Sequence, residues 1–591
     1  EKQGDLAGAE AAYRGLIARE PDAVQQHLQL VRFFERNDQS GKAEATLKEL
    51  VASRPEDADL RVALAQYYAQ KGQKDQVLSV LQQAVKDLPE AWGPHAFLAQ
   101  HYLAVEEREK AVAVLDGFME RVQTGPDRLR AQLLKARVRF QEQKPDQALE
   151  LVDAVLKEDA GNVEAHALKG DILAVKKDFE GAVAEYRAVV HEQPQNVAVA
   201  LKLARVHFLN NEPGLAEDTY KKVLEQNDTV RQAYAGLVDV YRRQGKPEQV
   251  KETLEALLEV APEDADTLTA LGDMAFSARD VDQARTYYER LEQVAPDSPV
   301  TQDKLGMLRL ASEDPEGALK RFEEALEKNP DYAPALNRLA TVRVRQGKLD
   351  QALDRVQAQV EARPENPDFR LTLGRLYAMD KKPDKAREQF EKALDLAPDS
   401  QAPLLHLARL EESLGRMDEA ISRYKEMFER NPGDQALGLI LATLYEREGQ
   451  AEKAMEVYRD VLEANPDSVL AANNLAFYYA EYQPEGVSLE EALELMERPM
   501  RERSDAPSIV DTAAWIHYRM GNYEKARDLL LALGDQIGDS GVLHYHLGMI
   551  YLALENTELA ATHLRTAVES ESDFPGKDEA EKALKGLDTE G

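Results

Sequence analysis

The chain has 591 residues, of which 43% are hydrophobic, 31% are charged and 6% are aromatic. This length exceeds what one ordinary hydrophobic core supports, so several domains are expected. Acidic residues number 108 and basic residues 74, and the resulting net charge of −34 repels nucleic acid and anionic lipid at long range. The sequence therefore predicts no nucleic-acid partner.

No cysteine occurs in the sequence, which excludes disulfides, thiolate metal sites and thiolate nucleophiles within these residues. No run of 18 apolar residues is present, so no transmembrane segment is predicted. The sequence begins at EKQGDLAGAE, without a methionine or a signal-like start. We interpret it as part of a longer protein, and attachment to a membrane through a segment before Glu1 stays open.

A repeat with a period of 34 residues runs from the beginning of the chain to its end. Fourteen of the 16 intervals between its marker residues are 34 residues long, and the other two are 37 residues (Ala111 to Ala148) and 38 residues (Ala454 to Ala492). The marker positions hold alanine or valine: Ala9, Ala43, Val77, Ala111, Ala148, Ala182, Ala216, Val250, Ala284, Ala318, Ala352, Ala386, Ala420, Ala454, Ala492, Ala526 and Ala560. So regular a spacing indicates one structural unit repeated along the chain.

Three further positions keep the same period. A large apolar residue follows the marker by four positions, as Phe322 does, and a proline follows it by twelve, as Pro330 does. A small residue precedes the marker by twelve, as Gly306 does. Because apolar residues recur at helical spacing in each half of the repeat, the pattern predicts two antiparallel helices.

Each kept position has a physical role in this arrangement. Turn formers such as RQGKLD separate the helices, and glycine there can take the left-handed conformation that ends a helix. Proline ends the second helix because it lacks an amide donor. The small positions are predicted to lie where the helix axes approach most closely, and the large residue is predicted to fill the gap toward the next repeat.

These landmarks resemble those of the tetratricopeptide repeat (TPR), whose 34-residue unit carries small, small, aromatic and proline positions at the same offsets. The resemblance covers essentially the whole chain. It implies an all-α fold, an α-solenoid in which tandem helix-turn-helix repeats form a right-handed superhelix and the first helix of each repeat lines a concave groove. Val77 and Val250 in place of alanine, and Asp228 in place of proline, depart from the pattern.

The period divides the chain into segments: a partial first repeat at 1–23, repeats at 24–128, a continuous array at 129–468, C-terminal repeats at 469–575, and a capping helix and tail at 576–591. A longer turn between repeats is predicted at 122–128. An insertion within a repeat is predicted at 481–488, where Ser488 and Glu491 are expected to form a capping box. Each insertion is either a tolerated loop or the mark of a bend or a contact point.

Signatures of catalysis and of cofactor binding are absent from the sequence. It contains no GxxxxGK[ST] phosphate loop, no GxGxxG after a predicted strand and no HExxH. His544 and His546 are two positions apart, so on a helix they point to different faces and do not jointly bind a metal. Acidic and basic residues at helical-neighbour spacing are typical of a solvated face. No enzyme activity, no cofactor and no metal site is predicted.

The residues expected to face the groove follow the small position of each first helix. From the N-terminus they are Arg32, Gln66, Gln100, Arg137, Asp171, Arg205, Asp239, Asp273, Met307, Thr341, Arg375, Arg409, Thr443, Phe477, Trp515 and Met549. Arg375 and Arg409 form a basic step on an acidic molecule. This step is either a receptor for a carboxylate or a solvated pair.

Aromatic residues gather at the C-terminal end of the same surface. Phe477, Trp515, Tyr518 and Tyr545 are therefore candidates, with the two arginines, for contacts with a partner. Trp515 is one of only two tryptophans in the chain. It is either a recognition anchor in the groove or a side chain packed between helices.

The closing repeats, from the stretch NNLAFYYAEY onward, resemble those of long bacterial TPR proteins. Many of those proteins are outer-membrane lipoproteins or periplasmic scaffolds of exopolysaccharide and exosortase-type (PEP-CTERM) envelope systems. The resemblance implies a location in the periplasm or at the outer membrane, and a cytoplasmic location is the alternative.

Three functions are open at this point. The first is a non-enzymatic scaffold that binds a protein or peptide in its groove and organises a cell-envelope assembly, secretion or exopolysaccharide-export machine. The second is a periplasmic superhelix that binds or guides polysaccharide, and the third is the regulatory arm of an enzyme whose catalytic domain lies outside these residues. The repeats, the net charge and the lack of catalytic motifs favour the first.

Overall fold

The computed structural model of the protein describes residues 5–572, 574 and 576–590. In these residues the chain forms 34 α-helices and one short 3-10 helix, and it contains no β-strand. The predicted all-α fold of tandem helix pairs is therefore confirmed. The chain divides into an N-terminal unit, Glu1–Val294, and a C-terminal unit, Ala295–Gly591.

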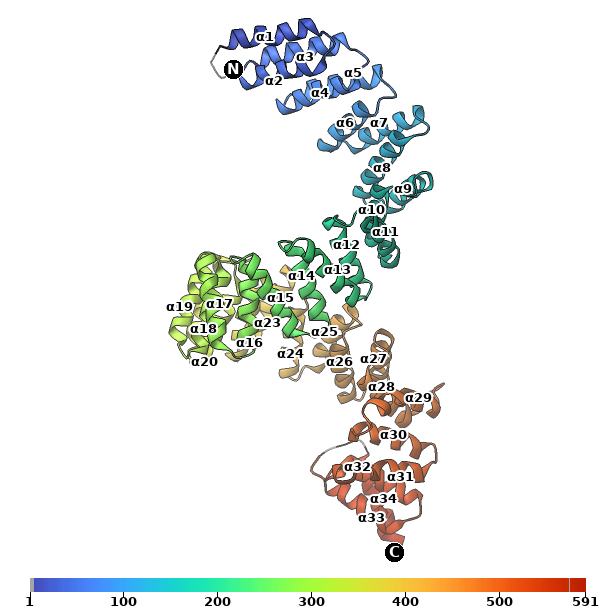
Figure 1. Ribbon diagram of the computed structural model, residues 1–591. Helices are drawn as coiled ribbons and strands as arrows, with labels where there is room; N and C mark the ends of the chain where they lie inside the picture. The colour runs from blue at the N-terminus through green and yellow to red at the C-terminus, as the bar shows by residue number, and fades with distance from the viewer. Residues whose placement is uncertain (1–4, 573, 575, 591) are drawn as a thin grey trace. The chain divides into compact units, whose positions relative to one another are not determined.

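The N-terminal unit contains α1 (Leu6–Arg19) followed by eight helix pairs (Figure 1). The first helices of these pairs are α2 (Val24–Arg36), α4 (Ala58–Gln70), α6 (Trp92–Ala104), α8 (Pro126–Gln141), α10 (Val163–Val175), α12 (Val197–Leu209), α14 (Arg231–Arg243) and α16 (Ala265–Ser277). The second helices are α3 (Ser40–Ser53), α5 (Lys74–Asp87), α7 (Arg108–Arg121), α9 (Pro145–Glu158), α11 (Phe179–Glu192), α13 (Pro213–Gln226), α15 (Pro247–Val260) and α17 (Val281–Val294).

The C-terminal unit contains eight further helix pairs and a closing helix, α34 (Lys577–Glu590). Its first helices are α18 (Pro299–Ala311), α20 (Ala333–Arg345), α22 (Pro367–Met379), α24 (Gln401–Ser413), α26 (Gln435–Arg447), α28 (Val469–Tyr482), α30 (Pro507–Arg519) and α32 (Gly541–Ala553). The second helices are α19 (Pro315–Lys328), α21 (Leu349–Ala362), α23 (Pro383–Leu396), α25 (Met417–Arg430), α27 (Ala451–Ala464), α29 (Leu489–Glu502), α31 (Tyr523–Leu531, followed by the 3-10 helix Gly534–Ile537) and α33 (Thr557–Glu569).

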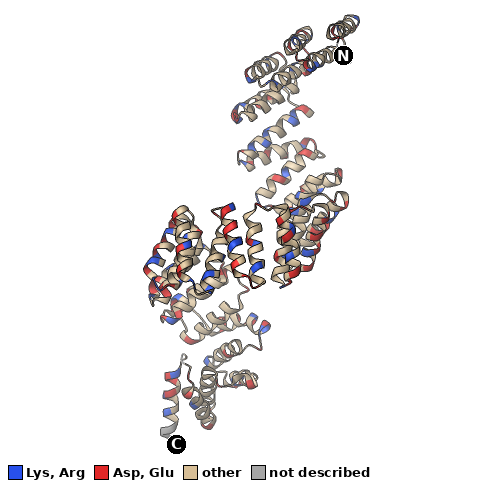
Figure 2. Ribbon diagram, turned by 90° about the vertical axis from the view of Figure 1, so that its left-hand side faces the viewer, with Lys and Arg blue, Asp and Glu red and all other residues tan. Residues whose placement is uncertain are grey.

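The core of each unit is a series of local clusters along the chain. Every marker residue from Ala43 to Ala560 is buried, whereas Ala9 is half-buried. Helices in extensive contact are only one or two positions apart in chain order. Each unit is therefore an α-solenoid, in which a helix pair covers the apolar faces of its neighbours. Charged side chains are spread over most of the helices (Figure 2).

The small residue of a first helix and the aromatic residue of the second helix meet within one repeat. A Cβ atom at Gly272 would lie 2.3 Å from Cε1 of Tyr288, so only glycine fits beneath this ring. The same arrangement recurs at Gly170 with Tyr186, Gly306 with Phe322 and Gly374 with Phe390. The ring thus covers the glycine of its own repeat. The prediction that the large residue fills the gap toward the next repeat is confirmed at Phe390, whose ring also stacks on His406 of the following repeat. At Tyr220 it holds, since that ring reaches Gly236 of the following repeat.

The turn between the two helices of every pair contains a residue with positive φ. In six of the 16 turns this residue is glycine, as at Gly72 (φ 71°), and in nine it is a different residue, as at Lys177 (φ 63°). The turn between α28 and α29 contains one of each kind, Gln483 (φ 43°) and Gly486 (φ 84°). The backbone bond beside Lys177, from Asp178 N–H to Leu173 O (2.9 Å), satisfies a carbonyl at the end of the first helix. The predicted role of glycine is confirmed at those six turns, and the other turns take the same conformation with other residues.

The 37-residue interval lengthens a helix. α7 ends at Arg121 and α8 begins at Pro126, and α8 has 16 residues where α10 has 13. The prediction of a longer turn at 122–128 is wrong because proline is favoured at the first position of a helix, so that α8 begins early. Gly125 (φ 101°) makes the bend before it.

The 38-residue interval lengthens the turn inside a repeat, since α28 ends at Tyr482 and α29 begins at Leu489. Ser488 Oγ accepts a hydrogen bond from Glu491 N–H (3.1 Å), which is half of the expected capping box. Of the segments expected at 1–23, 469–575 and 576–591, residues 1–4, 573, 575 and 591 lie outside the described residues.

Gly272→Ala is expected to lower the free energy of unfolding of the N-terminal unit by about 1–3 kcal/mol, because the new methyl group overlaps a buried ring. The Tyr288 ring is held in place, since its hydroxyl donates to Asp273 Oδ1 (2.6 Å). Gly117→Ala is the matched control: its Cβ meets nothing within 4 Å, so the same exchange stabilises α7 by about 1 kcal/mol. Urea unfolding followed by circular dichroism measures both, and shifts in the same direction contradict the close approach.

Candidate partner-binding surface

Hollows lie between neighbouring first helices in both units. In the N-terminal unit one of about 390 Å³ lies between α2 and α4. In the C-terminal unit one of about 220 Å³ lies between α20 and α22, and one of about 440 Å³ is lined by α26, α28, α30 and α32. The predicted groove residues that line these hollows are Arg32, Gln66, Thr341, Arg375 and Phe477. A further hollow, of about 360 Å³, lies among α19, α20 and α21.

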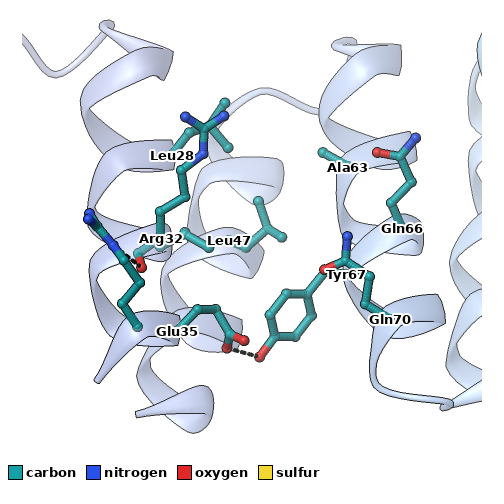
Figure 3. A pocket seen from close by; sticks show the side chains of 10 residues that line it. Leu28, Arg32, Glu35, Leu47, Ala63, Gln66, Tyr67 and Gln70 are labelled. Atoms are coloured by element: carbon teal, nitrogen blue, oxygen red, sulfur yellow. Dashed lines mark hydrogen bonds between the residues drawn. The ribbon is translucent and has the colours of Figure 1, made fainter. Parts of the chain in front are cut away.

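The hollow between α2 and α4 joins apolar and polar walls (Figure 3). Leu28 and Leu47 form part of the apolar wall. The Tyr67 hydroxyl donates to Glu35 Oε1 (3.0 Å), and Lys71 pairs with the same carboxylate. Burial, and then this carboxylate, raises the pKa of Tyr67 to about 12, so the phenol remains a hydrogen-bond donor at neutral pH.

Arg375 and Arg409 act on one imidazole of the C-terminal unit. Arg375 is half-buried and donates from Nη1 to Asn337 Oδ1 (3.1 Å), whereas Arg409 is exposed. The His406 ring stacks on Phe390 with 5.1 Å between centroids. Burial, and then the positive charges of Arg375 and Arg409, lowers the pKa of His406. The structure thus brings the two arginines of the predicted basic step into electrostatic range of one side chain.

Trp515 lies in the packed interior between helices. Its side chain is only 3% exposed, and its Nε1–H donates to Glu481 Oε2 (2.8 Å). Its ring stacks on His546 (4.0 Å between centroids) and on Tyr518 (4.7 Å), and Tyr545 beside it is also buried. The interpretation of Trp515 and Tyr545 as side chains open to a groove is therefore corrected, because the indole fills the space between α30 and α32 and its N–H is satisfied internally.

Two of the aromatic candidates are partly accessible. Phe477 is half-buried and lines the hollow of about 440 Å³. Tyr518 is half-buried as well, and burial raises its pKa. Binding of a partner by any of the six candidate residues stays a prediction.

A polar network that the sequence did not suggest lines the largest of these hollows. Asn473 Nδ2–H donates to Asn474 Oδ1 (3.2 Å), and Asn474 Nδ2–H donates to the Tyr458 hydroxyl (2.9 Å). That hydroxyl donates to Glu446 Oε1 (2.6 Å). The one available signal was a pair of adjacent asparagines within a helical pattern, where this residue is disfavoured.

His544 and His546 face different neighbours, as the sequence predicted. His544 Nδ1 lies 2.8 Å from Nδ1 of His563, and His546 Nδ1–H donates to Asp511 Oδ1 (2.6 Å). Within the described residues no three His, Asp or Glu side chains are grouped so that they could hold a metal ion. Nor does that part of the chain contain a helix with the length and apolar character needed to cross a membrane.

Comparison with known families agrees with the helix pairs. Profiles described as tetratricopeptide repeat match three sets of residues: 176–241, 309–376, 344–410, 377–422 and 413–476 for one profile, 98–163, 133–197 and 235–299 for a second, and 542–574 for a third. Together they span more than half of the chain, which therefore belongs to the tetratricopeptide-repeat family. A profile of the ChAPs family (Chs5p-Arf1p-binding proteins) matches residues 8–124.

Solved structures of repeat proteins are similar to the chain at low identity. The MamA protein is 25% identical, with 29% of this chain and 93% of that chain covered and a TM-score of 0.25. A tetratricopeptide repeat protein from Parabacteroides merdae is 15% identical, with coverage of 42% and 98% and a TM-score of 0.30. The APC/C hetero-tetramer Cut9-Hcn1 is 15% identical, with coverage of 94% and 95% and a TM-score of 0.31. No curated protein matches the chain.

Arg409→Gln is expected to raise the pKa of His406 toward its ordinary value, because a like charge that disfavours the imidazolium is removed. NMR titration of the chain labelled at histidine Cε1 measures this pKa. Arg416→Gln removes the same charge from a residue paired with Glu411 and serves as the control, for which no shift is expected. An unchanged midpoint in the Arg409 variant contradicts the basic step.

Proposed function

We propose that the chain is a non-enzymatic scaffold that binds polypeptide partners along the surface formed by its first helices. One observation supports this most strongly. The marker residues from Ala43 to Ala560 are buried, whereas residues that vary between repeats, such as Arg32, Arg375 and Phe477, line hollows between neighbouring first helices. The periodic residues hold the solenoid together, and the variable ones are left to contact another molecule.

The form of these hollows suits an extended polypeptide. Each lies between successive first helices and combines apolar walls with a few polar groups, as Leu28 and Tyr67 do in Figure 3. An extended segment can place an apolar side chain against the apolar wall of a hollow and a polar group against its polar atoms. The profile match at residues 8–124 supports the same conclusion, since the name of the ChAPs family describes proteins that bind other proteins.

We further propose that the scaffold serves a bacterial cell-envelope assembly, secretion or exopolysaccharide-export machine, in the periplasm or at the outer membrane. This rests on the resemblance of the closing repeats, from Asn473 onward, to those of envelope proteins. The gene upstream of Glu1 tests the location. A secretory or lipoprotein signal there supports an envelope role, and a cytosolic start contradicts it.

Binding of polypeptide is tested with random peptides displayed on phage and selected on the immobilised full chain. Arg375→Glu and Phe477→Ala are each expected to lower the affinity for a subset of the selected peptides at least tenfold, because these residues line the hollows. Lys425→Glu on α25 is the matched control for the charge reversal, since Lys425 is exposed on a second helix. Failure to enrich any peptide, or equal losses in the Lys425 and Arg375 variants, contradicts the proposal.

A further inference from the structure

The hollow of about 440 Å³ in the C-terminal unit is rich in hydrogen-bond acceptors and has no basic side chain in its lining. We call it the acidic hollow, and it is lined by Glu446, Asn473, Asn474, Phe477, Tyr478, Pro507, Ser508, Asp511, Thr512, Ser540, Val542 and Leu543. The lining contains two carboxylates, those of Glu446 and Asp511, and no lysine or arginine. Such an arrangement favours a positively charged occupant.

The hydrogen bonds beside the acidic hollow run in one direction. Burial, and then the bond to Glu446, raises the pKa of Tyr458, so its hydroxyl stays protonated and donates to the Glu446 carboxylate. The same oxygen must then accept from Asn474 Nδ2, which turns Asn474 Oδ1 toward Asn473. Asn473 therefore donates from Nδ2–H to Asn474 Oδ1, and the Asn473 carbonyl oxygen is the last acceptor in this series of hydrogen bonds.

That last acceptor is without a partner. Asn473 is only 7% exposed, and its Oδ1 is covered and makes no hydrogen bond within the described residues. A buried carbonyl oxygen in this state is unfavourable unless a donor supplies the missing bond. The chain of bonds fixes the amide orientation, and Asn473 is part of the lining, so we infer that the missing donor is an N–H or O–H group of an occupant of the hollow.

The other polar groups of the lining present lone pairs as well. The Thr512 hydroxyl donates its proton to Ser508 O (3.0 Å), so its oxygen is left as an acceptor. Asp511 Oδ1 accepts from His546, and Asp511 Oδ2 accepts no hydrogen bond from the described residues. The ring of Phe477 meets that of Tyr478 edge-on, with 6.0 Å between centroids and 89° between planes, and both line the hollow. Aromatic faces of this kind attract cations.

We propose that the acidic hollow receives a basic side chain, arginine or lysine, of the bound polypeptide, an inference that rests on the proposed scaffold function. A guanidinium or ammonium group carries only donors, which match the acceptors of Asn473, Asp511 and Thr512. Its charge complements the two carboxylates, and its stem lies against the aromatic rings. A neutral sugar offers acceptors as well as donors and brings no positive charge to the carboxylates of Glu446 and Asp511, so the lining favours the peptide.

The test uses the full chain, immobilised for surface plasmon resonance, and four acetylated and amidated peptides of sequence Gly-Ser-Phe-X-Phe-Ser-Gly. Position X is arginine, lysine, citrulline or norleucine, and the neutral hexasaccharide cellohexaose is a fifth probe. The arginine and lysine peptides are expected to bind at least tenfold more tightly than the citrulline and norleucine peptides. Equal binding of arginine and citrulline, or binding of cellohexaose in place of the basic peptides, overturns the proposal.

Two variants assign the site. Asn473→Leu is expected to weaken binding of the arginine peptide at least tenfold. The Tm of this variant is expected to stay equal or rise, because the substitution removes an acceptor that has no partner in the free protein. Asn337→Leu is its control: Asn337 is already paired with Arg375 between other helices, and the arginine peptide is expected to bind that variant as it binds the natural chain. Unchanged binding by the Asn473 variant overturns the assignment.

Tyr458 acts as a positioning residue, through the orientation of the two asparagines. Tyr458→Phe is expected to reduce the ratio of arginine to citrulline affinity severalfold, since Asn474 is no longer held in one orientation. Tyr288→Phe removes a similar tyrosine–carboxylate bond in the N-terminal unit and is expected to leave the ratio unchanged.

If selected peptides bind the chain but respond to none of these variants, the acidic hollow is excluded and the scaffold function stands. If no polypeptide binds at all, both are overturned.

Discussion

The close approach of two helices beneath an aromatic ring is the interaction on which the rest of the structure depends. The ring of Tyr288 lies so near Gly272 that a methyl group there would overlap it. The residue that follows the glycine in the sequence differs according to whether the ring above is tyrosine or phenylalanine. Asp273 accepts from the Tyr288 hydroxyl, whereas Met307 follows Gly306 where the ring is that of Phe322. Packing and hydrogen bonding are thus matched inside a single repeat.

In the helix pairs that are closed in this way and in the others alike, the apolar surface that remains is covered by the adjacent pairs. Core clusters follow one another along each unit, and helices in extensive contact are near neighbours in the chain. No residue outside a repeat and its neighbours is needed to bury its core. The surface of the first helices is therefore free to vary, and the acidic hollow and the hollow in Figure 3 differ in charge although the same backbone pattern builds both.

The repeating part of the fold could be predicted from the sequence because its causes are local. The spacing of Ala318 from its equivalents gives the length of the repeat, and Gly72 indicates a turn with left-handed backbone conformation. Lys177 takes the same backbone conformation, although no glycine marks its turn in the sequence. Pro126 lies where the sequence predicts a turn although it begins a helix, because proline is compatible with both.

The candidate site was predictable only in part, because it depends on contacts between residues far apart in sequence. The position of Phe477 on a first helix follows from the period, and it does line a hollow. The burial of Trp515 depends on Glu481, which lies 34 residues earlier and accepts from its indole N–H. The free acceptor of Asn473 depends on a tyrosine of the preceding helix and on a carboxylate of the helix before that one. Neither contact could be predicted from the repeat pattern of the sequence.

The central claim, that each repeat is held by its own helix contact and by its immediate neighbours, is tested most directly by native-state hydrogen exchange of Phe322→Ala. Removing this buried ring leaves a cavity between α18 and α19. The account predicts faster amide exchange from α18 to α21 and unchanged exchange from α24 to α33. Loss of protection throughout residues 295–591 would show one cooperative core and contradict it.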